Sequence, residues 1–392
     1  MDPLIAAGIG LALLYAFIMG TNDAANSIAI IVANRALSPL RAIALAVAGN
    51  FMGPFILTTA IARTIGTGIV ESGALTPAII IIALLSAIAF VVLATRAGFP
   101  VSSTHALVGG LLGAGLAAGG PAILSLPPAG LVAAIIIQAA AGGILGALVF
   151  GALARRLHED LRVGVILGGL VGASIVIIPL ILNGMIRPSG ILAIVVFIVV
   201  APVLGLFGAF LLDVAISHLF RYSRQNRMKK VFLPLEAAAG GLQALGNGGT
   251  GGQNAIGIMT ALLLAGGAIP EFSVPAWVLG AGAGAIALGT FFGAWEVIER
   301  VARKITRIRP YQGFSAAASA GGILAACSLS GIPVSSAHVM NGAIVGVGVT
   351  RGFSAVRWDI VRDIMLTWVT TIPVAVLVSF AAYQVLHLLG FG

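Results

Sequence analysis

The chain has few charged residues: only 8% of its 392 residues are Asp, Glu, Lys or Arg, whereas 59% are hydrophobic. Soluble domains carry about 25% charged residues, so this composition excludes an ordinary soluble protein. The single cysteine, Cys327, excludes an intramolecular disulfide and a cysteine-based metal cluster, and five histidines give no support to a zinc site. The composition therefore predicts an all-α polytopic membrane protein whose solvent is the lipid bilayer.

Acidic residues are especially scarce, with 12 Asp and Glu against 21 Lys and Arg. The resulting net charge of +9 would suit a nucleic-acid partner. The basic residues, however, lie at the ends of the apolar segments, where the cytoplasmic side of a membrane accounts for them. We therefore predict no nucleic-acid partner, and a multi-pass protein of the plasma membrane.

Hydropathy predicts about twelve transmembrane or re-entrant segments. A span needs about 20 residues, so the first and the eighth segment are too long for one straight helix. Both contain Gly- and Asn-rich stretches, and we expect broken helices at residues 20–27 and 246–255. Segments 99–118 and 332–350 are short enough to be re-entrant. The segments are residues 4–34, 42–62, 77–95, 99–118, 128–154, 163–183, 188–212, 232–264, 274–296, 311–330, 332–350 and 363–389.

The positive charges orient these segments. When the sides alternate from an external N-terminus, 19 of the 21 Lys and Arg fall inside, and only Arg63 and Arg187 fall outside. This distribution predicts that both termini lie outside. The inside residues are Arg35, Arg41, Arg96, Arg155, Arg156, Arg162, five within 221–230, five within 300–309, Arg351, Arg357 and Arg362.

The two long segments run in opposite directions, which indicates an inverted internal duplication. The first enters from outside, whereas its counterpart at 232–264 begins inside, after a basic loop. Inverted repeats with broken helices are typical of secondary transporters, whose substrate binds near the membrane midplane. We expect a first repeat at 1–120, linking helices and a cytoplasmic loop at 121–231, and a second repeat with the terminal helix at 232–392.

One hexapeptide occurs twice, as Pro-Val-Ser-Ser-Thr-His at 100–105 and Pro-Val-Ser-Ser-Ala-His at 333–338. Proline fits the first turn of a helix, and Ser or Thr hydroxyls satisfy the free amides there. A helix N-terminus also carries about half a positive charge and binds anions. Two such loops in matching places predict a shared oxyanion site rather than two ordinary caps. The candidate ligands are Ser102, Ser103, Thr104, Ser335 and Ser336.

The polar stretch 20–27, Gly-Thr-Asn-Asp-Ala-Ala-Asn-Ser, places a carboxylate at membrane depth. Such a group is tolerated where it lines a cavity or has a partner. Asn22 and Asn26 are four residues apart and share a helix face, with Asp23 beside them. Their oxygens suit a hard cation, so the stretch predicts a cation site.

The matching stretch of the second half keeps the register but loses the carboxylate. Thr250 corresponds to Asn22 and Asn254 to Asn26, whereas Gly251 stands in the place of Asp23. We predict Thr250 and Asn254 as further cation ligands. Glu236, fourteen residues before Thr250, is either an auxiliary charge of the site or an interfacial residue, and we favour the second interpretation.

His105 and His338 end the two hexapeptides. They either contact the ligand or are hydrogen-bonded imidazoles that fix the loops, and we favour the second interpretation. Serine and histidine without an orienting acid do not make a catalytic triad, so we predict no enzyme. Serine-rich helix starts without an aromatic or apolar pocket do not suit an amino-acid or nucleobase transporter. Asymmetric repeats with one internal acid suit alternating access better than an open channel.

The predicted oxyanion site and the Asp23 carboxylate are both negatively charged when the anion is bound, so their charges have to be compensated. An anion near Asp23 would be repelled strongly at low dielectric. A sodium ion or a proton between the two negative charges removes this repulsion, so anion and cation would bind together. Obligate co-binding is the basis of symport, and the sequence predicts a sodium- or proton-coupled oxyanion symporter.

These residues resemble the inorganic phosphate transporter (PiT) family, including its sulfate permease relatives. Stretch 20–27 is similar to that family's signature Gly-Ala-Asn-Asp-Val-Ala-Asn-Ser, and the hexapeptides to its paired Pro-Val-Ser-Thr-Thr-His loops. Stretches 299–352 and 358–373 are similar too, so the resemblance covers nearly the whole chain. It implies a phosphate permease driven by sodium or protons, with inverted repeats and often a homodimer. It also implies phosphate contacts at Asp23, Ser102, Ser103, Ser335 and Ser336, and cation sites at Asn22, Asn26, Thr250 and Asn254.

The second signature departs from the family pattern His-Gly-x-Asn-Asp-x-x-Asn-Ala, since Asn247, Thr250 and Gly251 replace its His, Asn and Asp. Loss of one carboxylate would lower the number of coupled cations or relax selectivity toward another tetrahedral oxyanion. Sulfate is the alternative substrate, because related sulfate permeases also lack a signature Asp. Asp23 favours phosphate, since phosphate has a hydroxyl that can donate to a carboxylate and sulfate has none.

Overall fold

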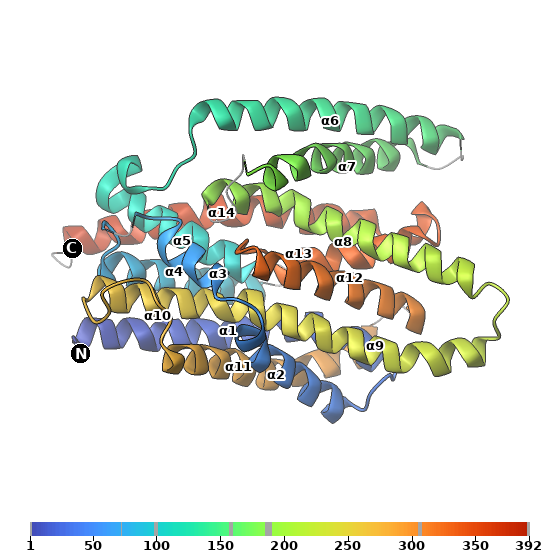
Figure 1. Cartoon of the computed structure of the whole chain (residues 1–392), viewed down its shortest axis with the longest axis horizontal. Coiled ribbons are helices and arrows are strands. Elements are labelled where there is room, and N and C mark those ends of the chain that lie inside the picture. The colour runs from blue at the N-terminus through green and yellow to red at the C-terminus, as the bar shows by residue number, and fades with distance from the viewer. Residues whose placement is uncertain are drawn as a thin grey trace.

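The structure, a computed structural model, describes residues 2–71, 73–97, 101–156, 160–184, 190–304 and 308–389. Over these residues the chain is helical, and most helices run along the long axis of the molecule (Figure 1). The helices are α1 (Pro3–Ala33), α2 (Pro39–Ile56), α3 (Ala60–Thr67), α4 (Pro77–Arg96), α5 (Ser103–Gly119), α6 (Ala129–Arg156), α7 (Leu161–Leu182), α8 (Ile191–Leu219), α9 (Gln225–Asn247), α10 (Gln253–Ala265), α11 (Ala276–Lys304), α12 (Pro310–Leu329), α13 (Ser336–Val349) and α14 (Trp358–Leu388).

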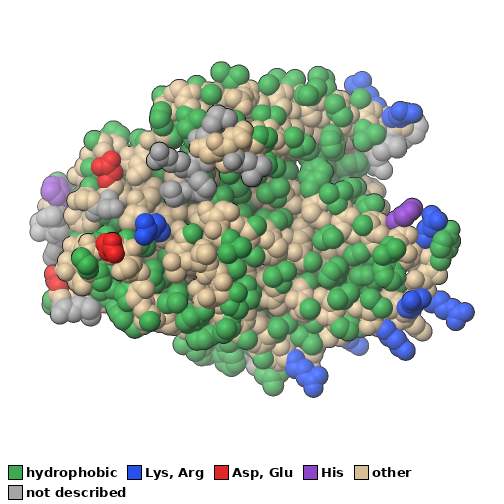
Figure 2. Space-filling view, viewed as in Figure 1, with side chains coloured by type: hydrophobic (Ala, Val, Ile, Leu, Met, Phe, Trp, Pro, Cys, Tyr) green, Lys and Arg blue, Asp and Glu red, His purple; other side chains and the backbone are tan. Residues whose placement is uncertain are grey.

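Nine helical segments of the described residues are long and apolar enough to cross a membrane. Helix α13, with 14 residues, is shorter than a full span. On the face of the molecule shown in Figure 2, hydrophobic side chains cover much of the outer surface of the bundle. The prediction of an all-helical, multi-pass membrane protein is therefore confirmed.

Helix α1 is continuous from Pro3 to Ala33, so the predicted break at 20–27 is wrong. The small residues of this stretch serve close packing instead, because a Cβ at Gly20 would collide with the backbone of α11. The polar side chains Asn22, Asp23 and Asn26 find partners on other helices. The backbone of α1 therefore does not have to open to satisfy them.

The second predicted break, at 246–255, is a widened turn rather than an interruption. Helix α9 ends at Asn247, residues 248–252 form a π-helical turn, and α10 continues from Gln253. The five residues of this turn, Gly-Gly-Thr-Gly-Gly, are all buried. Such π-helical turns inside helices often accompany functional sites.

A break that the sequence did not reveal separates α2 from α3. Helix α2 ends in an extended residue, Leu57, three residues after Pro54. The side chain of Gln253 bridges the gap, because its Oε1 accepts from the Ala62 amide (3.2 Å) and its Nε2 donates to the Thr58 carbonyl. A side-chain amide thus replaces helical hydrogen bonds that would otherwise be missing in an apolar environment.

The helix contacts repeat the same pattern twice along the chain. Helix α1 packs on α11, and α2 packs on α9. Helix α5 packs on α4 and α14, and α13 packs in the same way on α12 and α8. Helices α6 and α7 form a separate hairpin along one side of the bundle (Figure 1).

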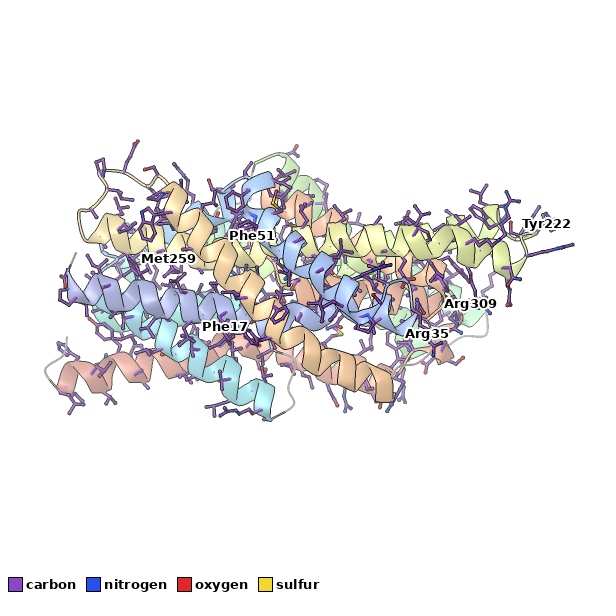
Figure 3. The ribbon with its side chains drawn as sticks, turned by 90° about the horizontal axis from the view of Figure 1, so that it is seen from below. Phe17, Arg35, Phe51, Tyr222, Met259 and Arg309 are labelled. Atoms are coloured by element: carbon purple, nitrogen blue, oxygen red, sulfur yellow. The ribbon has the colours of Figure 1, made fainter. Side chains whose placement is uncertain are left out.

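The two ends of the bundle differ in charge. Helix α1 begins and α14 ends at the same end of the molecule (Figure 1), which we call the terminal end. Arg35, Tyr222 and Arg309 lie at the opposite end (Figure 3), which we call the basic end. On the face shown in Figure 2, Lys and Arg gather at that basic end, whereas Asp and Glu lie toward the terminal end.

The close packing of α1 on α11 indicates which glycine of α11 cannot be replaced without loss of stability. A Cβ at Gly289 would collide with the carbonyl oxygen of Phe17, whereas a Cβ at Gly284 of the same helix meets no atom within 4 Å. We expect Gly289→Ala to destabilise the protein by about 1–3 kcal/mol through overpacking. Thermal unfolding in detergent measures this as a lower midpoint. Gly284→Ala is the control and should not lower the midpoint, and equal effects of the two variants would contradict the packing.

Candidate functional site

Helices α5 and α13 begin at the two hexapeptides. The Ser102 hydroxyl accepts a hydrogen bond from the His105 amide (3.2 Å), and the Ser335 hydroxyl accepts one from the His338 amide (3.4 Å). The caps share a backbone conformation, with φ −89° and ψ 115° at Ser102 and φ −83° and ψ 122° at Ser335. Both serines are therefore helix caps, which also keep a hydroxyl proton to donate. Pro100, where the first hexapeptide starts, lies outside the described residues.

The two helix starts meet through their histidines. The ring centroids of His105 and His338 are 4.7 Å apart, and those of His338 and Trp368 are 4.2 Å apart. Among the described residues, Nδ1 of His105 and both ring nitrogens of His338 have no hydrogen-bond partner. The favoured interpretation of these side chains as hydrogen-bonded imidazoles is thus wrong for those nitrogens. The His105 and His338 rings meet edge to face, at an interplanar angle of 68°, and bring the two hexapeptides together.

Helix α1 contributes the polar face that joins the two hexapeptides. Asn22 donates to the Ser103 hydroxyl (3.4 Å), and Asn26 donates to the Ser336 hydroxyl (3.4 Å). Ser336 in turn donates to Oδ2 of Asp23 (3.1 Å). One helix face therefore contacts both hexapeptides, as the four-residue spacing of the two asparagines allows.

The second half contributes fewer of its predicted residues. Asn254 donates to the Thr104 hydroxyl (2.9 Å), so α10 contacts the start of α5. Thr250 does not make such a contact, because its hydroxyl hydrogen-bonds to the Gly246 carbonyl (3.0 Å) and the Asn247 carbonyl (3.2 Å) of its own helix. The structure therefore brings Asn254 to the site and turns the Thr250 hydroxyl proton toward its own backbone.

The position that lacks a carboxylate has apolar neighbours. A Cβ at Gly251 would lie 2.9 Å from Cε of Met19 and 3.2 Å from Cδ1 of Ile286. The amide of Asn254 is 3.9 Å from the sulfur of Met19. A methionine side chain thus takes up the space beside Gly251, and this corner of the second half is apolar.

Glu236 lies away from these residues. It is fully buried on α9 and accepts a hydrogen bond from Asn34 (2.8 Å), which follows the last residue of α1. Asn34 is eight residues beyond Asn26, which is about 12 Å along a helix. The carboxylate of Glu236 therefore ties α9 to the end of α1 rather than lining the site.

Several polar side chains near the site escaped the sequence analysis. Tyr15 donates to the Ser103 carbonyl (2.9 Å). Asn247 donates to Asn50 (2.8 Å), and Asn50 donates to Thr290 (3.1 Å). A lone polar residue inside an apolar segment, such as Asn50, is the only signal the sequence offers for this group. These contacts connect the π-helical turn to α2 and α11.

The donors of the site carry no full positive charge. The described polar residues that are buried include neither Lys nor Arg, whereas Asp23 (4% exposed) is buried with Ser103 and Ser336. No group of three or more His, Cys, Asp or Glu that could hold a metal ion exists among the described residues. Two helix N-termini, hydroxyls and amides can bind an oxyanion, and a cation would rely on Asp23 and neutral oxygens.

The comparisons with known proteins agree with this chemistry. A model of the phosphate transporter family matches residues 19–164 and 162–379. A probable low-affinity inorganic phosphate transporter of Rhizobium meliloti (strain 1021) is 35% identical over 382 residues, which cover 97% of this chain and 96% of that protein. A putative phosphate permease of Thermococcus kodakarensis is 31% identical over 417 residues, which cover 100% of this chain and 99% of that protein.

A solved structure resembles the whole molecule. It is described as the sodium-dependent phosphate transporter, and it matches with a TM-score of 0.69 at 25% identity over 98% of this chain and 99% of that chain. The family match includes stretch 20–27 and both hexapeptides. The family consists of transporters, so the prediction that the chain is not an enzyme is confirmed. The chain belongs to the phosphate transporter family.

Proposed function

We propose that this protein is a sodium-coupled symporter that imports inorganic phosphate through the site between α1, α5 and α13. One observation carries the proposal: Asn22 and Asn26 reach hydroxyls at the starts of α5 and α13, with the Asp23 carboxylate beside them. The names of relatives that cover almost the whole chain support phosphate as the substrate. The name of the similar solved structure supports sodium as the coupling ion.

Phosphate would bind at the starts of α5 and α13. Its oxygens would replace the hydrogen-bond partners on α1 that the Ser103 and Ser336 hydroxyls have in this structure. Ser103 and Ser336 lie between their helix N-termini and α1, so each can turn its proton toward the anion. Free amides of the first helical turns add further donors. Because these groups are buried, each hydrogen bond to the anion is stronger than in water.

Sodium would bind next to the anion, at Asp23 and neighbouring amide oxygens. The Oδ1 atom of Asn254 is buried and has no partner among the described residues, so it is free to bind a cation. The two helix N-termini together contribute about one positive charge. By this count one sodium ion balances Asp23 and dihydrogenphosphate, and two balance Asp23 and hydrogenphosphate.

The repeated helix contacts support an internal duplication, and we place its two inverted repeats at 1–120 and 232–392. Helix α8, from the linking region 121–231, takes part in the pattern, because it packs on α13 as α14 packs on α5. We place the basic end in the cytoplasm and the terminal end outside the plasma membrane, since positive residues favour the inside. The starts of α5 and α13 then approach the same site from opposite sides, which is the arrangement that alternating access requires. Helix α13 would be re-entrant in this arrangement.

Phosphate is preferred over sulfate because of Asp23. Phosphate carries a hydroxyl near neutral pH that can donate to the carboxylate, whereas sulfate would present only acceptors to it. Met19 fills the corner beside Gly251, so no carboxylate takes the place of the missing one at that position. A single acidic ligand points to a small number of coupled sodium ions.

Uptake into proteoliposomes tests the proposal. We expect labelled phosphate to accumulate when an inward sodium gradient is imposed, and not when a pH gradient is imposed alone. Sulfate in excess should not compete, because it cannot donate to Asp23. Uptake that is independent of sodium, or sulfate uptake as fast as phosphate uptake, would contradict the proposed substrate and coupling.

A further inference from the structure

A second polar cavity, of about 580 Å³, lies apart from the site described above. It is lined by the last turns of α8 with Arg221, by the start of α12 with Arg309, and by Arg351 after α13. Arg309 marks the basic end of the bundle (Figure 3). The other polar residues of its wall are Ser217, His218, Tyr311, Gln312 and Thr350.

Of the nine residues that line this cavity, all except Val214 carry a side-chain hydrogen-bond donor. Guanidinium groups bind oxyanions through paired, charge-assisted hydrogen bonds. Among the described residues, none of the three arginines forms an ion pair. By contrast, Arg357 and Arg362, which do not line this cavity, pair with neighbouring Asp residues at 3.2 Å and 3.0 Å.

Among the described residues, a buried carboxylate, that of Asp213, lies behind the wall. Asp213 is 1% exposed, and its Oδ2 accepts a hydrogen bond from the Thr350 hydroxyl at 2.5 Å. Three guanidinium charges less this carboxylate leave two positive charges at the cavity. That excess matches the charge of hydrogenphosphate, the divalent form of the proposed substrate.

The cavity shares part of its wall with a larger cavity that extends toward the transport site. Gln312 and Arg351 also line a larger cavity of about 1060 Å³. This larger cavity reaches Ala29 on α1 and Asn341 on α13. These residues are three and five positions beyond Asn26 and Ser336, which is less than two helical turns. An anion that leaves the transport site toward the basic end would therefore come close to the three arginines.

We propose that Arg221, Arg309 and Arg351 form a second oxyanion site, which receives phosphate released from the transport site. This inference rests on the proposed function, and it places a second phosphate site where the anion leaves the transport site toward the cytoplasm. A phosphate ion held here neutralises the positive charge that attracts an exiting anion, so phosphate inside the cell slows import by occupying this site. Eight of the nine lining residues have polar or charged side chains, which favours a free oxyanion over a lipid headgroup, whose phosphate chemistry is the same.

Equilibrium binding of inorganic phosphate in the presence of sodium tests this inference. The full chain is placed in nanodiscs of phosphatidylcholine, and we expect two phosphate ions per chain. Arg309→Gln combined with Arg351→Gln should weaken one of the two by about tenfold or more, because hydrogen bonds between charged partners are lost. Arg41→Gln, which removes an arginine that lines neither cavity, is the matched control and should bind as the wild type does.

The transport site is removed separately by Ser103→Ala combined with Ser336→Ala, which should leave one phosphate ion bound. One phosphate ion in the wild type, unaffected by the double arginine variant, would overturn the second site and leave the proposed function intact. Two phosphate ions in the double serine variant would instead contradict the transport site. Phosphatidylglycerol that displaces phosphate from wild-type nanodiscs, but not after the arginines are replaced, would show a lipid-headgroup site and overturn the proposal.

Discussion

Replacing Asp23 by Asn is expected to lower sodium-driven phosphate uptake at least about 100-fold, since two charge-assisted interactions are lost. The carboxylate accepts a hydrogen bond from Ser336 and is the only acidic side chain described among the contacts that join α1, α5 and α13. Asparagine has the same size but carries no negative charge for sodium. The initial rate of labelled phosphate uptake into proteoliposomes measures the loss.

Glu236→Gln is the matched control for this variant. Glu236 is a buried carboxylate like Asp23, but it hydrogen-bonds to Asn34 at the end of α1. Glutamine retains an oxygen that can accept a hydrogen bond from Asn34. The free-energy difference between this variant and the wild type should therefore stay below about 0.5 kcal/mol, and uptake within about twofold of the wild type. If Asp23→Asn transports like Glu236→Gln, then Asp23 has no part in the site.

Removing the hydroxyls of Ser103 and Ser336 is expected to raise the KM for phosphate by about tenfold for each serine. Each hydroxyl lies between a helix N-terminus and α1, where it can donate to the anion. The double alanine variant should lose most of its phosphate binding. Concentration dependence of uptake, together with equilibrium binding, separates this loss of affinity from a loss of folded protein.

Ser319→Ala serves as the control for the serine variants. Ser319 is also buried, but it donates to the Gly205 carbonyl (3.1 Å) between α12 and α8. Its replacement removes one buried hydrogen bond without touching the hexapeptides, and the KM should not change. An equal rise in KM for Ser319→Ala would mean that the effect comes from helix packing rather than from phosphate contacts.

The sequence is most informative where a local motif or spacing is enough to determine the structure. Two hexapeptides of proline and serine predict two buried helix starts, and α5 and α13 begin within them. The spacing of Asn22 and Asn26 predicts a shared helix face, and both side chains reach the hexapeptides from that face. These inferences hold because local rules of capping and helical periodicity decide them.

The sequence is less informative where the answer depends on a distant partner. Stretch 20–27 looks like a helix break, yet α1 stays continuous because its polar groups are satisfied by other helices. The break after α2 is stabilised by Gln253, about 190 positions along the chain. The apolar neighbour of Gly251 is Met19, which no spacing rule connects to it.

The central claim is that one oxyanion site lies where the starts of α5 and α13 meet α1. An experimental structure determined with phosphate and sodium tests it most directly. We expect a tetrahedral anion within hydrogen-bond distance of the Ser103 and Ser336 hydroxyls, and a sodium ion at the Asp23 carboxylate. A structure in which phosphate binds only elsewhere, such as at the three arginines, while both hydroxyls keep their hydrogen bonds to α1, would contradict it.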